Sequence, residues 1–349
     1  MRWVLMWLML FSTPVWGLCP PFLPEIVNMT FKHRQDVISA ELAINVLTVT
    51  RPQLELRTQQ GGTVLARYDL STVGGASAFK ASPLIEDTNL DGLADYIWLL
   101  SADGMLWRFS LQNGQLRAPQ LMADLRDSGL TFIATVALLR SRLPTHLAPN
   151  RWRDSEQHLL LVVGRDLPAG NDVMLVLRFP VNHPPEGVTY FRQLISKPLS
   201  DRIASQVNPN GHQSADSAGW QLRLPGKIST TPLVIAGVLY VPVVISDVPA
   251  VCKVEHTEQQ LFSLHLHTAS RVYTGLQQRI PYVPAAQLAL QQAAGKMQLV
   301  LRSKEQQVVV LSDMLAISEK CFDCVEPLSW ERFPVLKRLA TYRHEAGAH

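Results

Sequence analysis

The chain has 349 residues, and its 32 Lys and Arg residues against 29 Asp and Glu residues give a formal net charge of +3. Hydrophobic residues make up 47% of the chain and charged residues 17%, which supplies a large core and excludes wholesale disorder. The nearly balanced charge argues against a dedicated nucleic-acid binder, because such proteins concentrate positive charge on one face. Length alone allows one large all-β domain or two ordinary domains.

The N-terminus has the pattern of a secretory signal peptide. Arg2 supplies a positive charge, residues 3–11 form a short apolar run, and Gly17 ends a segment that a signal peptidase accepts. The run is shorter than the about 20 residues of a membrane-spanning helix, and Pro14 interrupts it. The alternative is an uncleaved anchor or a buried strand. We expect residues 1–17 to be cleaved and the protein to be exported to the periplasm or cell surface, without a transmembrane span.

Four cysteines follow this segment, and we expect them to be structural. An even number of cysteines in an oxidising compartment favours disulfides, and four cysteines allow three pairings. The last two have a spacing that also occurs in redox and zinc sites. A zinc ribbon, however, needs a second such pair, and a thioredoxin-like site needs a βαβ context. The expected structural cysteines are Cys19, Cys252, Cys321 and Cys324.

Helical periodicity is scarce, and short runs of alternating apolar residues recur instead. Many short strands separated by turns predict an all-β sandwich, barrel or propeller. Segments 112–130, 140–157 and 180–222 are rich in proline, polar or small residues and are predicted to be loops. The expected strands are Val64–Leu70, Tyr96–Leu100, Met105–Leu111, His158–Val163, Val173–Phe179, Leu233–Val244, Leu261–Leu266, Met297–Leu301 and Val308–Leu311.

A degenerate repeat distinguishes among these three architectures. A turn feeding a strand that ends near a leucine occurs at Gly62–Leu70, Gly104–Leu111, Gln260–Leu266 and Val308–Leu311. In a propeller the chain returns to such a hairpin once per blade. Because the spacing is irregular, we predict a degenerate β-propeller with irregular insertions over residues 18–325, followed by a C-terminal tail at 326–349.

The strongest chemical signal is the acidic loop Asp87–Asp95, with the sequence DTNLDGLAD. Calcium takes six to eight oxygen ligands, and positions 1, 3 and 5 of a tight loop deliver side-chain oxygens to one centre. Gly92 at position 6 permits the sharp turn. The expected Ca²⁺ ligands are the side chains of Asp87, Asn89, Asp91 and Asp95 and the backbone carbonyl of Leu93.

This loop differs from an EF-hand in two respects. Position 12, where an EF-hand has a bidentate glutamate, is Trp98, and the flanking residues 79–85 and 96–100 have strand patterns. It is therefore similar to the nine-residue calcium loops between propeller strands. The alternative is an Asx-rich β-turn without metal, because Asp, Asn and Gly are common turn residues. Three carboxylates and an amide at alternate positions favour the calcium site.

The next predicted strand carries an aromatic stripe. Alternation places its bulky side chains on one face and Arg108 and Ser110 on the other. Asn113 and Gly114 then predict a tight hairpin turn. We expect the stripe to form core between two blades, and its members are Met105, Trp107, Phe109 and Leu111.

Together the loop 87–95 and the block Asp103–Leu111 (DGMLWRFSL) resemble the C-terminal β-propeller of PilY-type proteins, the type IV pilus tip-associated adhesins and assembly factors. The likeness spans roughly residues 75 to 332. It continues in order through Thr131–Thr135, Val163–Arg165, Ile228–Leu233, Gly237–Tyr240, Cys252 with Leu261–Leu264, and Leu328–Glu331. We find no Asp-x-Ser-x-Ser or Arg-Gly-Asp motif and no counterpart of the family's long N-terminal region, so the functions of that region are not carried over.

The resemblance implies a non-enzymatic protein of the type IV pilus, either an assembly factor or a tip-associated protein, in which calcium controls conformation or docking. Its implied partners are minor pilins or the pilus assembly machinery, with a host or surface ligand left open and no nucleic acid. Two alternatives remain: a periplasmic quinoprotein-like propeller enzyme, and a calcium-dependent adhesin unrelated to pili. Location also stays open between the periplasm and the pilus.

A second, weaker metal pattern involves histidines near the end of a predicted strand. His265 and His267 are two residues apart and so face the same way, with His256 and Cys252 nearby in sequence. Exposed polar positions on a strand explain them equally well, and no tetrahedral ligand set is evident. We find no Gly-rich phosphate loop and no Gly-x-Ser-x-Gly turn, so nucleotide chemistry and serine hydrolysis have no support.

Overall fold

The computed structural model describes residues 27–33, 36–45, 53–59, 62–73, 79, 81–148, 151–181, 187–199, 217–245, 258–273, 277–293, 296–312 and 314. The predicted signal peptide, the four cysteines Cys19, Cys252, Cys321 and Cys324, and the predicted tail at 326–349 all lie outside these residues. The predictions made for them therefore stay predictions.

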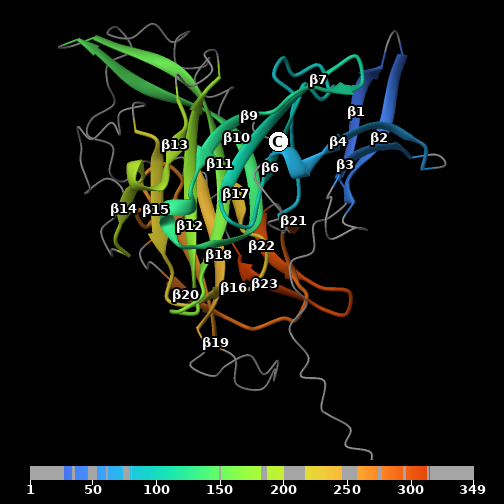
Figure 1. Cartoon of the computed structure of the whole chain (residues 1–349). Coiled ribbons are helices and arrows are strands. Elements are labelled where there is room, and N and C mark those ends of the chain that lie inside the picture. The colour runs from blue at the N-terminus through green and yellow to red at the C-terminus, as the bar shows by residue number, and fades with distance from the viewer. Residues whose placement is uncertain are drawn as a thin grey trace, which may run out of the picture.

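The described residues form five β-sheets and contain no α-helix (Figure 1). The first sheet consists of β1 (Val27–His33), β2 (Asp36–Asn45), β3 (Gln53–Thr58) and β4 (Val64–Asp69). The second consists of β5 (Leu84–Glu86), β6 (Tyr96–Leu100), β7 (Met105–Gln112), β8 (Gln115–Leu116), β9 (Gln120–Asp124) and β13 (Thr189–Tyr190).

The third sheet consists of β10 (Thr131–Ala148), β11 (Arg151–Asp166), β12 (Asn171–Pro180), β14 (Ile195–Lys197) and β15 (Gly219–Arg223). The fourth consists of β16 (Lys227–Ile228), β17 (Leu233–Ile235), β18 (Val238–Ile245), β19 (Glu258–His265) and β20 (Gln277–Ile280), and the fifth of β21 (Gln287–Ala293), β22 (Lys296–Arg302) and β23 (Gln307–Leu311). Short 3-10 turns occur at Leu70–Thr72, Arg126–Ser128 and Phe191–Gln193.

Each sheet packs against the next one in chain order, and the alternation of side chains along single strands explains how. In β6, Ile97 and Leu99 point into the core shared with the first sheet, whereas Trp98 and Leu100 point into the core shared with the third. In β11, Leu160 faces the second sheet and Leu161 faces the fourth. A further core joins the fourth and fifth sheets. The middle strands are therefore apolar on both faces, which is typical of stacked blades.

Six of the nine predicted strands fall within observed ones, and the predictions Val64–Leu70 and Leu261–Leu266 each extend one residue past the end of β4 and β19. β6 has the predicted bounds, and β7 exceeds its prediction by one residue. The predicted strand Leu233–Val244 is instead a hairpin of β17 and β18, because Ala236 and Gly237 both have positive φ and turn the chain. Asn113 (φ 52°) and Gly114 (φ 73°) form the predicted turn between β7 and β8.

The prediction of a loop at 140–157 is wrong. These residues belong to the hairpin of β10 and β11, whose strands are 18 and 16 residues long. β12 pairs with β11 only up to Gln157, so residues 143–148 and 151–155 form a two-stranded ribbon paired only within itself. We call residues 143–148 and 151–155 the arm. It projects from the stacked sheets as the green ribbon at the upper left of Figure 1.

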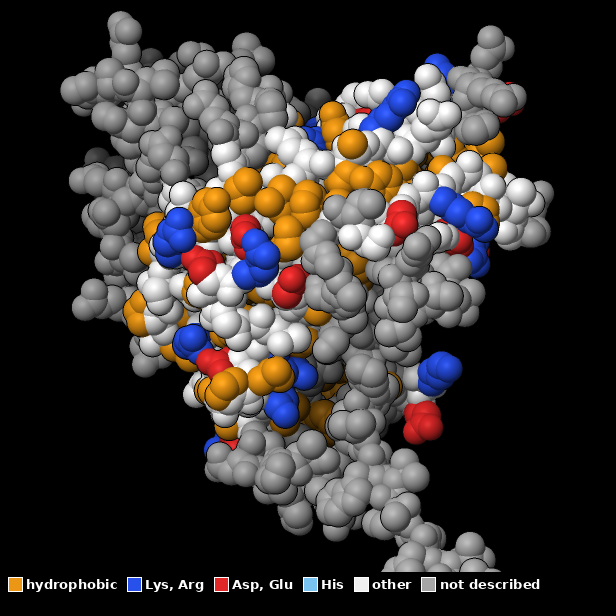
Figure 2. Space-filling view, viewed as in Figure 1, with side chains coloured by type: hydrophobic (Ala, Val, Ile, Leu, Met, Phe, Trp, Pro, Cys, Tyr) orange, Lys and Arg blue, Asp and Glu red, His pale blue; other side chains and the backbone are white. Residues whose placement is uncertain are grey.

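The view in Figure 2 shows Lys and Arg side chains interspersed with Asp and Glu side chains rather than gathered by sign. Hydrophobic side chains lie between them across the same face. Among the described residues, no helix has the length and hydropathy needed to cross a bilayer.

Candidate functional site

The loop Asp87–Asp95 connects β5 to β6 on the second sheet, as the strand patterns at its two ends predict. Asp87 organises its first half. Its Oδ1 accepts the backbone N–H groups of Leu90 (2.6 Å) and Asp91 (3.2 Å), and its Oδ2 accepts that of Gly92 (2.7 Å). The chain curls because Leu90 (φ 62°) and Gly92 (φ 83°) adopt left-handed backbone conformations. Leu90 is a strained residue at an exposed tip, with 75% of its surface accessible.

The remaining polar side chains of the loop also bind within it. Asp91 Oδ1 accepts the backbone N–H of Leu93 at 2.8 Å, and Asp91 Oδ2 accepts the side-chain amide of Asn89 at 2.9 Å. Asp95 Oδ2 accepts the backbone N–H of Thr88 at 2.7 Å and also its hydroxyl. Together these bonds close the nine residues into a ring of Asx-type turns.

In this conformation the loop carboxylates face the N–H groups of the loop itself. Across the described residues, no three or more His, Cys, Asp or Glu side chains converge as a group that would hold a metal ion. The donor set nevertheless fits calcium chemically, because it consists of oxygen atoms alone and a carboxylate oxygen that accepts one N–H retains a second lone pair. Binding at this loop therefore requires its carboxylates to converge more closely than they do in this conformation.

Backbone hydrogen bonds fix the end of the loop to three strands. The N–H of Ala94 donates to the carbonyl of Thr30 in β1 at 2.7 Å, which links the loop to the first sheet. The N–H of Asp95 donates to Glu86, and the carbonyl of Asp95 accepts from Leu111 in β7 at 2.8 Å. The loop therefore lies at the junction of the first and second sheets.

A buried polar network lies directly behind the loop and is centred on Glu86, which is 3% exposed. Its carboxylate accepts the indole N–H of Trp98 at 2.7 Å and two N–H groups of Arg108, each at 3.0 Å. His158 Nε2 lies 2.9 Å from Glu86 Oε1, in a contact whose angle does not suit a straight hydrogen bond. The Arg108 guanidinium also stacks on the ring of Tyr96, 3.6 Å from its centroid.

These neighbours keep Glu86 ionised. Burial by itself raises the pKa of Glu86, but contact with His158, the charge of Arg108 and the Trp98 N–H together outweigh burial and hold that pKa below its usual value. The buried charge is thus paired and hydrogen-bonded, as burial of an ion requires.

Sequence reasoning missed this network. Glu86 accepts from Arg108, 22 positions away, and contacts His158 on a different sheet, so no spacing in the sequence links the three residues. Arg108 was expected only to face away from the aromatic stripe, which it does. The one available signal was an acidic residue between an apolar strand and the loop, and that pattern is common in turns.

The second metal hypothesis gains little from the structure. His265 and His267 lie together, with ring centroids 5.7 Å apart. Burial, together with the charges of His265 and Arg178, lowers the pKa of His267 to about 3, so its imidazole is neutral. The Nε2 atom of His267 lies 3.1 Å from Ser141 Oγ. β19 separates His265 from Glu258 by roughly 23 Å at a strand rise of about 3.3 Å per residue. Cys252 and His256 precede Glu258 and lie outside the described residues.

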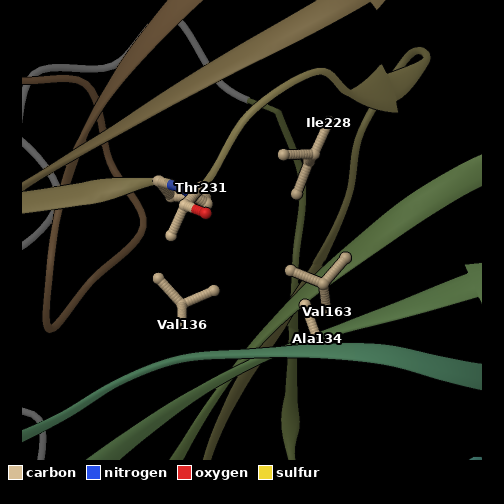
Figure 3. Close-up of a pocket in the computed structure, with 6 residues that line it drawn as sticks. Ala134, Val136, Val163, Ile228 and Thr231 are labelled. Carbon is tan, nitrogen blue, oxygen red and sulfur yellow. The ribbon is translucent and has the colours of Figure 1, made fainter. Parts of the chain in front are cut away.

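A small apolar crevice opens between the third and fourth sheets (Figure 3). Ala134 and Val136 of β10 and Val163 of β11 line one side, and Ile228 and Thr231 line the other. Its lining carries no ionisable side chain. The crevice is a packing gap between blades that does not reach the loop.

No known family model matches the sequence, and no curated protein matches it at the sequence level. Among solved structures, the chain is similar to the C-terminal domain of Pseudomonas aeruginosa PilY1, with a TM-score of 0.52 and 14% identity over 83% of this chain and 73% of that one. That domain is a β-propeller, and the similarity confirms the predicted all-β propeller fold and the structural likeness to PilY-type proteins.

A weaker similarity is found to the tricorn protease, with a TM-score of 0.31 and 10% identity over 82% of this chain and 30% of that one. Similarity at this level supports no conclusion about the fold or the chemistry of the present protein.

Proposed function

We propose that this protein is an exported, non-enzymatic protein of the type IV pilus, acting in pilus assembly or at the pilus tip, with a calcium-binding loop at Asp87–Asp95 that controls conformation or docking. The observation that carries the proposal is the propeller fold shared with the PilY1 C-terminal domain over 83% of the chain. The block that carries the sequence resemblance, residues 87–95 and 103–111, lies in β5 to β7 of that fold.

The role of calcium is proposed from the chemistry of the loop. Side-chain oxygens of Asp87, Asn89, Asp91 and Asp95, with the Leu93 carbonyl, would hold the ion. A bound divalent cation offsets the mutual repulsion of three neighbouring carboxylates. The chain contributes the curled backbone, in which Leu90 and Gly92 have positive φ and make the tight turn that such a loop needs.

The position of the loop supports a conformational role. Ala94 is bound to Thr30 of the first sheet, and Asp95 to Leu111 of the second, so the loop bridges two blades. Ordering the loop stabilises the junction between these blades and the surface that they present together. We propose that minor pilins or other parts of the assembly machinery dock on a surface set in this way, with a host or surface ligand as the alternative partner.

Isothermal titration with calcium tests the loop. The wild-type protein is expected to give a saturable binding heat, and Asp91→Ala is expected to abolish it. Asp36→Ala is the matched control, because it removes an exposed aspartate at the start of β2, outside the loop, and should bind like the wild type. Equal heats from the wild type and Asp91→Ala would remove the calcium site.

Deletion of the gene tests the biological role. We expect fewer surface pili by electron microscopy and weaker twitching and attachment, with recovery by the wild-type gene and not by the Asp91→Ala gene. Normal piliation, twitching and attachment in the deletion strain would contradict a pilus function. Recovery by both genes would keep the pilus role and reject control by calcium.

A further inference from the structure

We propose that the arm, residues 143–148 and 151–155, is the element that responds to the state of the loop 87–95, and that Arg140 and His158 at its base transmit that state. This inference rests on the calcium binding proposed above. The observation behind it is that two consecutive residues of the β5 end and loop, Glu86 and Asp87, are both held by the base of one hairpin.

The two holding residues form one cross-strand pair. Arg140 in β10 is directly opposite His158 in β11, so their side chains leave the hairpin on the same face. Arg140 Nη2 donates to the backbone carbonyl of Asp87 at 2.8 Å, and His158 Nε2 lies 2.9 Å from Glu86 Oε1. The hairpin base therefore contacts the start of the loop at two adjacent points.

The contact of His158 with Glu86 and the contact of Arg140 with Asp87 differ in how firmly the acidic residue is held. Glu86 is fixed in a buried network with Trp98 and Arg108, so the His158 contact acts as a fixed point. Asp87 belongs to the exposed loop, and its carboxylate is the first of the expected calcium ligands. Because the carbonyl that Arg140 binds belongs to the same residue, any reorientation of Asp87 acts directly on the Arg140 hydrogen bond.

The opposite face of the hairpin base is held as well. Ser141, the residue after Arg140, points to the other side of β10, where its hydroxyl lies 3.1 Å from His267 Nε2 in the turn after β19. The base of the hairpin therefore contacts the loop on one face and the fourth sheet on the other. Beyond it the hairpin continues through the exposed Arg142–Glu156 ion pair into the arm.

The arm is suited to amplify a small change at its base. A two-stranded ribbon without a third strand is only marginally stable by itself, so its order depends on how firmly its base is held. Tightening the Asp87–Arg140 contact should slow opening of the arm, and loosening it should speed opening. The arm then presents its backbone in a more ordered form when the loop is occupied.

Hydrogen exchange measured by mass spectrometry on peptides covering residues 143–155 tests this inference, with and without saturating CaCl₂ in the purified protein. In the wild type, calcium should slow exchange of the arm on the order of tenfold, the size expected for one charge-assisted hydrogen bond. Arg140→Gln should reduce that effect to about twofold or less. Arg142→Gln is the matched control, because it removes an arginine two residues along the same face that does not touch the loop, and it should respond like the wild type.

Arg140→Lys and Asp91→Ala complete the design. Lysine keeps a cationic donor and should retain part of the calcium response, whereas Asp91→Ala should lose both the binding heat and the response. A wild-type protein that binds calcium by titration but shows the same arm exchange with and without it overturns the coupling alone. Equal responses in the wild type and Arg140→Gln also overturn it. Absence of calcium binding in the wild type overturns the calcium site, and the coupling with it.

Discussion

Glu86 and Asp87 are adjacent acidic residues with opposite environments. Glu86 is 3% exposed and accepts hydrogen bonds from side chains that strands β6 and β7 fix in place. Asp87 is partly exposed at the start of the loop, and its carboxylate accepts from backbone N–H groups three to five residues ahead. The comparison shows that the Glu86 carboxylate links strands of two sheets, whereas the Asp87 carboxylate shapes the loop at the surface.

The largest expected effect comes from removing the buried partner. Glu86→Ala should lower the free energy of unfolding by about 3–5 kcal/mol, because it leaves Arg108 as a largely buried charge without its counter-ion. Urea denaturation at neutral pH measures the loss. Glu156→Ala is the control, since it breaks an exposed pair with Arg142 and should cost within about 0.5 kcal/mol. Similar losses in the two variants would mean that the Glu86 network is not structural.

Acid should weaken the same network, with a smaller effect than its removal. Because the folded-state pKa of Glu86 is below its usual value, its contribution to stability is complete above the unfolded pKa, near 4.5, and is lost as pH falls through the folded pKa. Denaturation curves between pH 2 and 7 measure this loss in the wild type. In Glu86→Gln the dependence below pH 4.5 should be shallower, and an unchanged profile would assign the acid sensitivity to other carboxylates.

Calcium is expected to stabilise the protein through the loop that Asp87 begins, and not through the buried Glu86 network. With the proposed calcium site, a free concentration of 100 Kd is expected to stabilise the folded wild type by about 2.7 kcal/mol. Asp91→Ala should lose this gain while keeping its metal-free stability within about 1 kcal/mol, because Asp91 is exposed and bonds only within the loop. Melting temperatures with CaCl₂ and with chelator measure both quantities. A calcium gain that survives in the variant places the ion elsewhere.

The smallest effect is expected at the turn of the loop. Gly92→Ala should cost about 1 kcal/mol without metal, since the φ of +83° disfavours a side chain while an added Cβ meets no atom within 4 Å. Gly104→Ala gives the contrast, because its Cβ would lie 2.7 Å from the ring of Phe132 and force a shift in the core. Chemical denaturation of both variants should rank Gly104→Ala as the more destabilised, and the reverse order would contradict a strained but open loop.

Local patterns in the sequence were sufficient for much of the second sheet. Short apolar runs bounded by turn residues predicted β6 and β7, and the Asn113–Gly114 pair predicted the turn after β7, because these signals involve residues only a few positions apart. The loop 87–95 was found in the same way. The segment 140–157 was not, because Pro144 and Pro149 indicate a loop. Pro144 is tolerated because β10 is an edge strand, where a missing N–H costs little.

The sequence by itself determined the all-β class, the positions of many strands and the acidic loop, since each depends on side-chain alternation or on turn residues close together in the chain. Only the tertiary structure decided that Glu86 meets Arg108 and His158, that Arg140 meets the loop, and that a long hairpin extends beyond the third sheet. The physical reason is that these contacts form between strands from different parts of the chain, and their partners are chosen by packing of the sheets rather than by sequence spacing.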